Sequence, residues 1–342
     1  MKIDLLCNQE PNGSFNGVTS KTVWGDDHRI GVGGAELALI TLAEEWTKAG
    51  HNVVLYNNPW EENASIFEQR PVVAFDPNAD RDVIINFRSP NVSTVPAKGL
   101  KVWWSTDQRS VGDYAKFAGY VDKIVCISSF HAEYFAHTYG IENAIVIDLP
   151  VRIDDFNFDI QKVRNRIIFT SVPDRGLHNL WRMWARIQKA IPNVTLVITS
   201  DYRLWGAGSN NEGYRVKWMT QKGFEFLGAV NRARYLEELM KAELFLYPCN
   251  YDELFCISVA EAQFAGAYPI TSTIGALKTT NMACQIDVDA SDQRNDLAFI
   301  DNAASLLNDA DLGMYSFKIS EMARKRFSPE NILAQWDEKV FK

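Results

Sequence analysis

The hydrophobic pattern of the first half alternates between short apolar runs and longer segments in which apolar residues recur every three or four positions. The short runs are rich in β-branched and aromatic residues, which favours buried strands. They lie at residues 2–7, 51–56, 82–87, 101–106 and 123–128. Helical spacing predicts amphipathic helices over residues 33–50 and 129–140. This alternation indicates a parallel sheet covered by helices.

The same alternation begins again near residue 166. Apolar runs predict strands at residues 166–171, 194–200, 224–230, 244–249 and 268–272. Helical spacing predicts helices at 176–191 and 233–242, and we expect Trp181 and Trp184 of the first of these to lie in the core.

The restart predicts an α/β fold with two successive domains, residues 1–152 and 153–327. The join lies in the stretch 149–165, which has no clear period. A last helix, near 329–341 in the segment 328–342, could pack on either domain, and packing back on the N-terminal domain is one option.

Composition and charge narrow the functional classes. The chain has 342 residues, of which 46% are apolar and 23% charged, as in folded globular proteins. No apolar run approaches the roughly 20 residues that span a bilayer. The formal net charge is −8, and residues 1–150 carry 12 basic against 19 acidic residues. We therefore expect no strong interaction with nucleic acid and at most peripheral contact with a membrane.

The five cysteines are scattered and include no CxxC pair. This pattern favours reduced thiols and hence a cytoplasmic location. The N-terminus is interpreted as a short strand followed by a polar loop, not as a signal peptide. The histidines are also scattered, and the acidic pair Asp287 and Asp289 lies in a polar stretch that we interpret as a solvated loop. We predict no metal site.

Two glutamates flank an almost uncharged segment near residue 257. Ser258 and Glu261 form the pattern S-x-x-E, which predicts a helix with a capping box. Glu253 lies on the loop that leaves the predicted strand 244–249, and the carboxyl ends of parallel strands are where such sheets place their ligands. Helix N-termini attract phosphate. We therefore expect backbone amides to face an anion at Phe255, Cys256 and Ile257. Capping alone could explain Glu261, but it does not explain Glu253.

Three other positions are candidates for ligand contact. The glycines of the stretch 31–34 lack the G-x-G-x-x-G spacing, so they either let a ligand approach the first helix or only ease helix entry. Arg175 lies where a strand gives way to a helix and could bind a diphosphate, the alternative being a surface ion pair with Asp174. Asp107 follows a buried strand and is either a site residue or a helix cap.

Taken together, these segments resemble the retaining GT-B glycosyltransferases of the family 4 type, over nearly the whole chain. Glu253 and Glu261 are similar to the family's E-x7-E motif, residues 33–56 to its first glycine loop, helix and strand, and "SVPDRGL" to its donor loop. The segment "FLGAV" is similar to the part that holds the nucleotide base. The resemblance implies two Rossmann-like domains facing a central cleft, with the nucleotide sugar on the C-terminal domain and the acceptor on the N-terminal domain.

The resemblance also implies roles for single residues. Gly33 and Gly34 would offer amides to the donor phosphates, Arg175 would contact the diphosphate, and Val230 would lie beside the base. Phe255 follows the first glutamate of the motif, and Cys256 and Ile257 would give backbone contacts to the phosphate or sugar. Glu261 would bind the ribose, and Glu253 would face the transferred sugar. Asp107 is a second candidate catalytic residue.

The sequence departs from the family's pattern at three places. No basic residue occurs in "FTSVPD", where many relatives have an arginine; Cys256 stands where glycine is common; and Ser105, Thr106 and Asp107 occupy the region of a usual histidine.

The predicted function is metal-independent transfer of a sugar, with retention, to a hydroxyl acceptor such as a glycan or a lipid-linked sugar. The donor would be a nucleoside-diphosphate sugar, with UDP or GDP as the first choices, and no cofactor is expected. A sugar-nucleotide epimerase would instead need an acid/base pair, which only Asp107 and Glu253 offer. A degenerate sugar-nucleotide-binding module without transferase activity is the third alternative.

Overall fold

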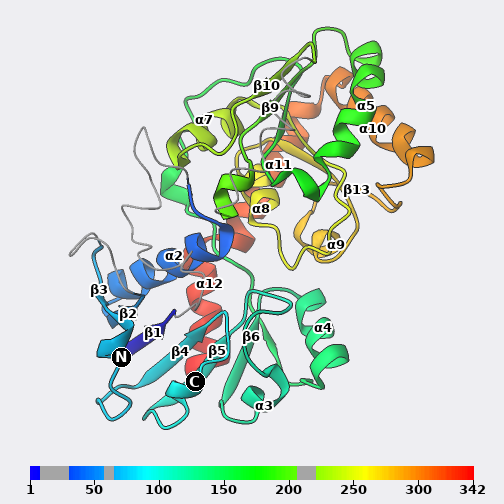
Figure 1. Cartoon of the computed structure of the whole chain (residues 1–342). Helices are drawn as coiled ribbons and strands as arrows, with labels where there is room; N and C mark the ends of the chain where they lie inside the picture. The colour runs from blue at the N-terminus through cyan, green and yellow to red at the C-terminus, as the bar shows by residue number, and fades with distance from the viewer. Residues whose placement is uncertain (8–30, 58–64, 206–220) are drawn as a thin grey trace. The chain divides into compact units, whose positions relative to one another are not determined.

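The computed structural model describes residues 1–7, 31–57, 65–205 and 221–342. The chain divides into two compact units (Figure 1). Of the described residues, the first unit contains 1–7, 32–57, 65–150 and 327–342, and the second contains 31, 151–205 and 221–326.

The first unit is built on a seven-stranded parallel sheet in the order β3-β2-β1-β4-β5-β6-β7. Its strands are β1 (Lys2–Leu6), β2 (Asn52–Tyr56), β3 (Glu68–Arg70), β4 (Val83–Phe87), β5 (Leu100–Trp104), β6 (Lys123–Cys126) and β7 (Ile145–Val146). All five strands expected from the sequence are present. The pattern missed β3 and β7, because strands of three and two residues are too short to show a period.

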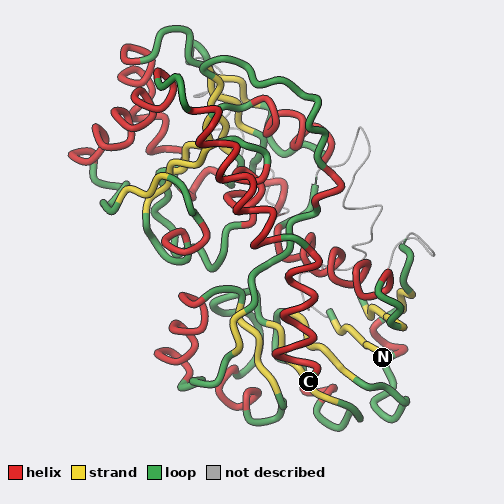
Figure 2. Tube along the Cα trace, turned by 180° about the vertical axis from the view of Figure 1, so that it is seen from behind, coloured by secondary structure: helices red, strands yellow, loops and turns green. Residues whose placement is uncertain are grey.

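Helices of the first unit pack on its sheet (Figure 2). They are α2 (Gly34–Lys48), α3 (Tyr114–Ala118), α4 (Ser129–Tyr139) and α12 (Pro329–Trp336), and a π-helical turn (Asp337–Phe341) follows α12. Trp103 packs on Tyr114 and Phe117, while its neighbour Trp104 packs on Phe87 and Trp336. Successive residues of a strand point to opposite faces, so the two tryptophans anchor helices on both sides.

The last helix lies against this unit. Trp336 of α12 contacts Trp46 of α2 edge to face, with ring centroids 5.3 Å apart, and Trp104 of β5 at 5.5 Å. The contacts among these large buried rings explain why α12, some 180 residues beyond β7, belongs to the first unit.

The second unit contains a six-stranded parallel sheet in the order β10-β9-β8-β11-β12-β13. Its strands are β8 (Arg166–Phe169), β9 (Thr195–Ile198), β10 (Phe224–Phe226), β11 (Leu244–Tyr247), β12 (Tyr268–Ser272) and β13 (Cys284–Ile286). The sequence predicted five of these six and missed β13, which has only three residues.

The helices of the second unit are α5 (Leu177–Ala190), α7 (Arg232–Lys241), α8 (Ile257–Phe264), α9 (Leu277–Thr280), α10 (Asp296–Asn308) and α11 (Leu312–Phe327). Short 3-10 turns occur in the two units at Val72–Ala74, Val92–Thr94, Ile153–Asp155, Pro173–Arg175, Tyr202–Trp205 and Gln293–Asn295. On α5, Trp184 is buried as expected, but Trp181 is only partly buried, so its assignment to the core is wrong. The two residues are nearly a full turn apart, and Trp181 lies at the edge of the buried face.

Both sheets reverse their strand order beside their first strand. In the first unit β1 pairs with β2 on one side and β4 on the other, and in the second unit β8 pairs with β9 and β11. Helical connections leave such a pair of strands in opposite directions, which opens a crevice at the carboxyl ends where open α/β sheets bind ligands. The residues that follow β1, β4, β8 and β11 therefore lie where such sheets bind ligands.

Candidate functional site

Arg175 and Glu253 meet at the reversal point of the second sheet. Arg175 ends the turn that follows β8, and Glu253 lies on the loop that follows β11. The Nη1 atom of Arg175 donates to both carboxylate oxygens of Glu253, at 3.0 and 3.1 Å. The Tyr247 hydroxyl donates to Oε1 of the same carboxylate at 2.6 Å. Because these residues come from adjacent strands, a pairing across 78 positions of sequence becomes local.

The surroundings favour the charged form of Arg175 and the neutral forms of Tyr247 and Cys249. Burial disfavours the guanidinium cation, but attraction to Glu253 outweighs this and raises the pKa of Arg175. Burial, reinforced by the Glu253 charge, raises the pKa of Tyr247 well above its usual value and that of Cys249 to about 12. Arg175 also stacks on the Tyr251 ring, 4.3 Å from its centroid. The guanidinium is thus a fixed cation, and the alternative of a surface ion pair with Asp174 is wrong.

The helix after Glu253 begins differently from the expected capping box. Helix α8 starts at Ile257, its N-cap is Cys256, and Ser258 already lies in the first turn, so the capping-box assignment is wrong. Cys256 adopts a left-handed conformation with φ 68° and ψ 77°. Within the described chain, the N-cap side chain makes no hydrogen bond to the first turn. The left-handed backbone of Cys256 directs the chain into α8. Phe255, the residue before it, is buried.

Glu261 is held by two side chains from α7. Its Oε1 accepts from Nη2 of Arg232 at 2.9 Å, and its Oε2 accepts from the Tyr235 hydroxyl at 2.8 Å. Arg232 also pairs with Asp155. Glu261 is 2% exposed and lies in the second turn of α8, so the expectation that it caps the first turn is wrong. Its carboxylate instead joins α8 to α7.

Val230 immediately precedes α7. Its carbonyl oxygen accepts a hydrogen bond from the backbone N–H of Gly31 at 2.9 Å, and Gly31 belongs to the same compact unit. The side chain of Asn231 caps α7 by accepting from the N–H of Arg234. The segment predicted to lie beside a base is therefore a strand-to-helix connection at the carboxyl edge of the second sheet.

The two glycines of the first unit frame the start of α2. Gly33 is the N-cap and Gly34 the first helical residue. A Cβ atom on Gly33 would lie 2.7 Å from Oε2 of Glu36, so the missing side chain leaves room for that carboxylate. Burial raises the pKa of Glu36, and the charge of Arg88 opposes the shift. The Glu36 carboxylate therefore packs against the N-cap of its own helix, and a side chain at position 33 would make it shift.

Arg88 links Glu36 to Asp107. Its Nη2 donates to Oδ1 of Asp107 at 3.1 Å, its Nε donates to Oδ2, and its Nη1 lies 3.7 Å from Oε1 of Glu36. Arg88 follows β4 in a left-handed conformation, with φ 69°. Cys7, next after β1, is buried beside the same group, and burial raises the pKa of its thiol to about 12. This cluster marks the reversal point of the first sheet.

His131 of α4 holds the backbone of Asp107. Its Nε2 lies 3.2 Å from the Asp107 carbonyl oxygen, and its Nδ1 lies 3.4 Å from the N–H of Ile127. A carbonyl only accepts and an N–H only donates, so the imidazole is neutral with its proton on Nε2. Burial lowers the pKa of His131 to about 4. Asp107 is thus fixed through both its side chain and its main chain.

The polar stretch near residue 288 has structural contacts. Asp287 accepts from the Thr273 hydroxyl at 2.6 Å, and Asp289 accepts from the N–H and hydroxyl of Ser291. Across the described ranges, no three His, Cys, Asp or Glu side chains are arranged to hold a metal ion. In the same ranges, no helix is both long and apolar enough to cross a bilayer.

Sequence reasoning missed the partners of the predicted residues. It did not single out Glu36, Arg88, Tyr247, Arg232 or Tyr235. A signal existed for the last two, because Arg232 and Tyr235 are three positions apart on an amphipathic helix and so share a face. For Arg88 the only signal was its place directly after a buried strand.

The second unit matches a known family. Residues 164–309 match the family model described as "Glycosyl transferases group 1". This stretch contains Arg175, Val230, Glu253 and Glu261. A search of curated proteins gives no match to the chain.

Solved structures resemble the whole chain. AviGT4, a glycosyltransferase involved in avilamycin A biosynthesis, is 17% identical with a TM-score of 0.68, over 98% of this chain and 96% of that one. HepE from Anabaena, solved with UDP and glucose, is 14% identical with a TM-score of 0.68, over 99% of both chains. Sucrose-phosphate synthase from Thermosynechococcus elongatus is 14% identical with a TM-score of 0.70, over 99% and 98%.

The fold is that of the GT-B glycosyltransferases. The predicted fold class is therefore confirmed: the GT-B fold has two Rossmann-like α/β domains, as the two parallel sheets show. Sequence identities of 14–17% show that the fold is similar and nothing more. The match of residues 164–309 relates that segment to the glycosyltransferases of group 1.

Proposed function

We propose that this GT-B protein transfers a sugar from a nucleoside-diphosphate sugar to a hydroxyl acceptor, with retention and without a metal ion. The observation that carries the proposal is the Arg175–Glu253 pair. It lies at the reversal point of the sheet within the segment that matches the glycosyltransferase family. A fixed cation beside a carboxylate suits a reaction in which negative charge leaves on a diphosphate while positive charge develops on a sugar.

In this proposal the second unit binds the donor. Arg175 contacts the diphosphate, and backbone amides at Cys256 and Ile257 add to the positive end of α8. Glu261 binds the ribose through the lone pairs that Arg232 and Tyr235 leave available, and Val230 lies beside the base. We choose a UDP-sugar first, because the similar structure of HepE was solved with UDP and with UDP-glucose.

The first unit takes the acceptor in this proposal, with Asp107 as a second catalytic candidate and Gly33 and Gly34 near the donor phosphates. Arg88 lies between Asp107 and Glu36. This group of charged side chains supports acceptor binding by the first unit, because charged side chains form hydrogen bonds with hydroxyl groups. A cytoplasmic location is part of the proposal, and the five free thiols support it.

The reaction breaks the bond between the anomeric carbon and the diphosphate oxygen and forms one to the acceptor oxygen on the same face. The acceptor proton passes to the departing diphosphate, so no protein nucleophile is required. Glu253 stabilises the developing positive charge on the sugar, and Arg175 the negative charge on the leaving group.

The test combines donor binding with product analysis. Thermal-shift measurements with UDP-, GDP- and ADP-sugars identify the base, since a ligand at a hundred times its Kd stabilises by about 2.7 kcal/mol. Binding should persist in EDTA, and a strict requirement for Mg²⁺ or Mn²⁺ would refute metal independence. The anomeric configuration of the product, measured by NMR, decides retention.

The same assay separates the alternatives. A transferase releases free nucleoside diphosphate and a glycosylated acceptor, whereas an epimerase returns an isomerised nucleotide sugar. A binding module without activity would show a thermal shift with the donor but no hydrolysis of it, even over long incubations.

A further inference from the structure

Three backbone carbonyls of the loop that carries Glu253 accept hydrogen bonds from other segments of the chain. The side chain of Asn179, on α5, donates from Nδ2 to the Pro248 carbonyl at 2.9 Å. The hydroxyl of Ser272 donates to the Cys249 carbonyl at 2.7 Å. The N–H of Ala276 donates to the carbonyl of Glu253 itself, also at 2.7 Å. The loop 248–256 therefore has a fixed carbonyl at its start and at Glu253.

Two glycines allow these contacts to be close. A Cβ atom on Gly176 would lie less than 3.0 Å from the Pro248 carbonyl oxygen, and one on Gly275 would lie 2.5 Å from the Glu253 carbonyl oxygen. Both glycines have positive φ, 112° and 58°. Any side chain at either position would push the loop away, so the packing leaves the loop no room to move in these two directions.

Asn179 has only one possible amide orientation. Its side chain is fully buried, and its Oδ1 accepts from Nη1 of Arg182 at 3.0 Å. A guanidinium can only donate, so the atom that faces it must be the oxygen. Nδ2 then faces Pro248 as a donor, and the contact with Arg182 selects this orientation.

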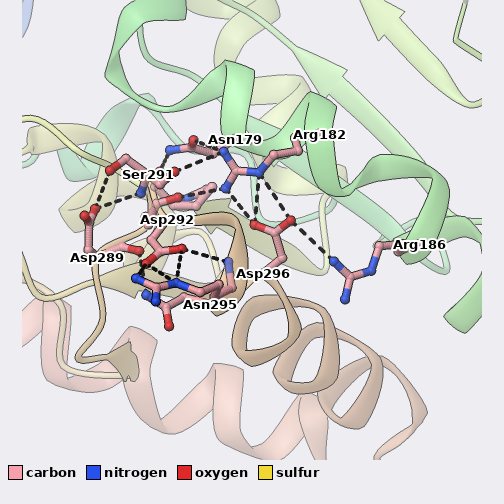
Figure 3. Close-up of polar contacts among 11 residues, drawn as sticks. Asn179, Arg182, Arg186, Asp289, Ser291, Asp292, Asn295 and Asp296 are labelled. Carbon is pink, nitrogen blue, oxygen red and sulfur yellow. Dashed lines mark hydrogen bonds and ion pairs between the residues drawn. The ribbon is translucent and has the colours of Figure 1, made fainter.

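Arg182 is itself held in place from several sides (Figure 3). Its Nη2 donates to Oδ1 of Asp296 at 2.6 Å and to the Ala290 carbonyl at 3.0 Å, and its Nε donates to both Asp296 oxygens at 3.1 and 3.2 Å. Its Nη1 also lies 3.3 Å from the Ser291 carbonyl. Asp296 is the first residue of α10 and 3% exposed. A chain of contacts thus runs from α10 through Arg182 and Asn179 to Pro248.

We propose that Asn179 is a positioning residue, which with Arg182 and Asp296 sets the place of the loop 248–256 and hence of the Glu253 carboxylate. The inference rests on the proposed function, in which Glu253 faces the transferred sugar. Asn179 acts through the Pro248 carbonyl, five residues before Glu253. A displacement of about 1 Å at a reacting centre can cost on the order of a hundredfold in rate, so a modest relaxation of this loop lowers kcat.

The test compares Asn179→Ala with Asn281→Ala. Asn281 is a matched control in the same unit: it is 1% exposed, and its Nδ2 also donates two hydrogen bonds, to the Thr271 hydroxyl at 2.9 Å and the Cys284 carbonyl at 2.8 Å. Both variants lose buried hydrogen bonds, so both should melt at a lower temperature. At a temperature well below both transitions, we expect Asn179→Ala to lower kcat about tenfold with the Kd for UDP changed less than threefold. Asn281→Ala should keep the wild-type kcat.

A second measurement needs no activity. The N–H of Ala276 is protected by the Glu253 carbonyl, so its hydrogen exchange reports on the loop. We expect at least about tenfold faster exchange in Asn179→Ala than in wild type, and wild-type exchange in Asn281→Ala. If Asn179→Ala does not fold, Arg182→Gln replaces it, because that side chain is 26% exposed and its loss releases the orientation of Asn179.

The outcomes of these two measurements test the positioning role of Asn179 separately from the proposed function. Equal kcat and equal Ala276 exchange in the Asn179 and Asn281 variants would overturn the positioning role. Faster exchange in a protein whose wild type transfers no sugar would retain the contact between Asn179 and the loop but refute the proposed function on which its catalytic meaning depends.

Discussion

The guanidinium of Arg175 spans both carboxylate oxygens of Glu253, from a single nitrogen at 3.0 and 3.1 Å. The Glu253 side chain is 6% exposed and the Arg175 side chain 25%. Two charges so placed act as one unit, because removing either leaves the other buried without its counter-ion. Substitutions in this pair therefore change stability and activity together, and the two effects have to be measured separately.

Arg175→Ala should weaken the binding of a nucleoside diphosphate more than Arg175→Lys does. A charge-assisted hydrogen bond to phosphate is worth about 1.5–3 kcal/mol, and lysine keeps the charge while losing the planar donor geometry. Isothermal calorimetry with UDP measures the difference directly. If both variants bind UDP as the wild type does, Arg175 serves only the ion pair with Glu253.

Glu253→Gln should lower kcat at least about tenfold, equivalent to roughly 1.4 kcal/mol, and leave donor affinity nearly unchanged. The amide keeps the shape of the side chain but loses the negative charge that stabilises the sugar in the transition state. Steady-state kinetics at saturating donor check this expectation. A fully active variant would assign the carboxylate a structural role.

Glu261→Gln should behave differently. Its carboxylate is buried against Arg232 and Tyr235, so loss of the charge should lower the free energy of unfolding by about 1–3 kcal/mol. If it also binds the ribose equally in ground and transition states, KM for the donor rises and kcat stays nearly constant. Urea denaturation and kinetics on this variant test both parts. The same kcat and KM changes as in Glu253→Gln would contradict the division of roles.

Acid should destabilise the first unit through His131. The folded-state pKa is about 4 against 6.5 for an ordinary imidazole, so between these values the unfolded chain binds more protons and stability falls as pH falls. The expected loss from pH 7 to pH 5 is about 2 kcal/mol. Urea denaturation at the two pH values should show a smaller loss in His131→Gln, which does not titrate. Equal losses in both proteins would mean that His131 is not the cause.

Cys256→Gly should be more stable than Cys256→Ala. The left-handed backbone at this N-cap strains any residue with a Cβ atom, by roughly 1–2 kcal/mol, and glycine removes that strain at some cost in chain entropy. We expect a net difference of about 1 kcal/mol between the two variants. Melting curves measure it, and an alanine variant as stable as the glycine variant would show that the turn relaxes without cost.

The sequence by itself determined the fold class and the positions of most strands and helices. Hydrophobic period is a local property, so runs such as 82–87 and 244–249 predicted β4 and β11 within one or two residues. The local rule that ligands gather after strands also selected Arg175, Glu253 and Asp107 as candidates. Strands of two or three residues, such as β7 and β13, escaped because they are shorter than any detectable period.

The tertiary structure alone decided which of these residues meet. Strand order places β8 beside β11 and β1 beside β4, and neither pairing leaves a trace in local sequence. Arg175 therefore pairs with Glu253 instead of its neighbour Asp174, and Glu261 binds Arg232 from α7 instead of capping its own helix. The physical reason is that charge pairing depends on distance in space, which the packing of whole strands and helices sets, whereas periodicity records only which side of each element is buried.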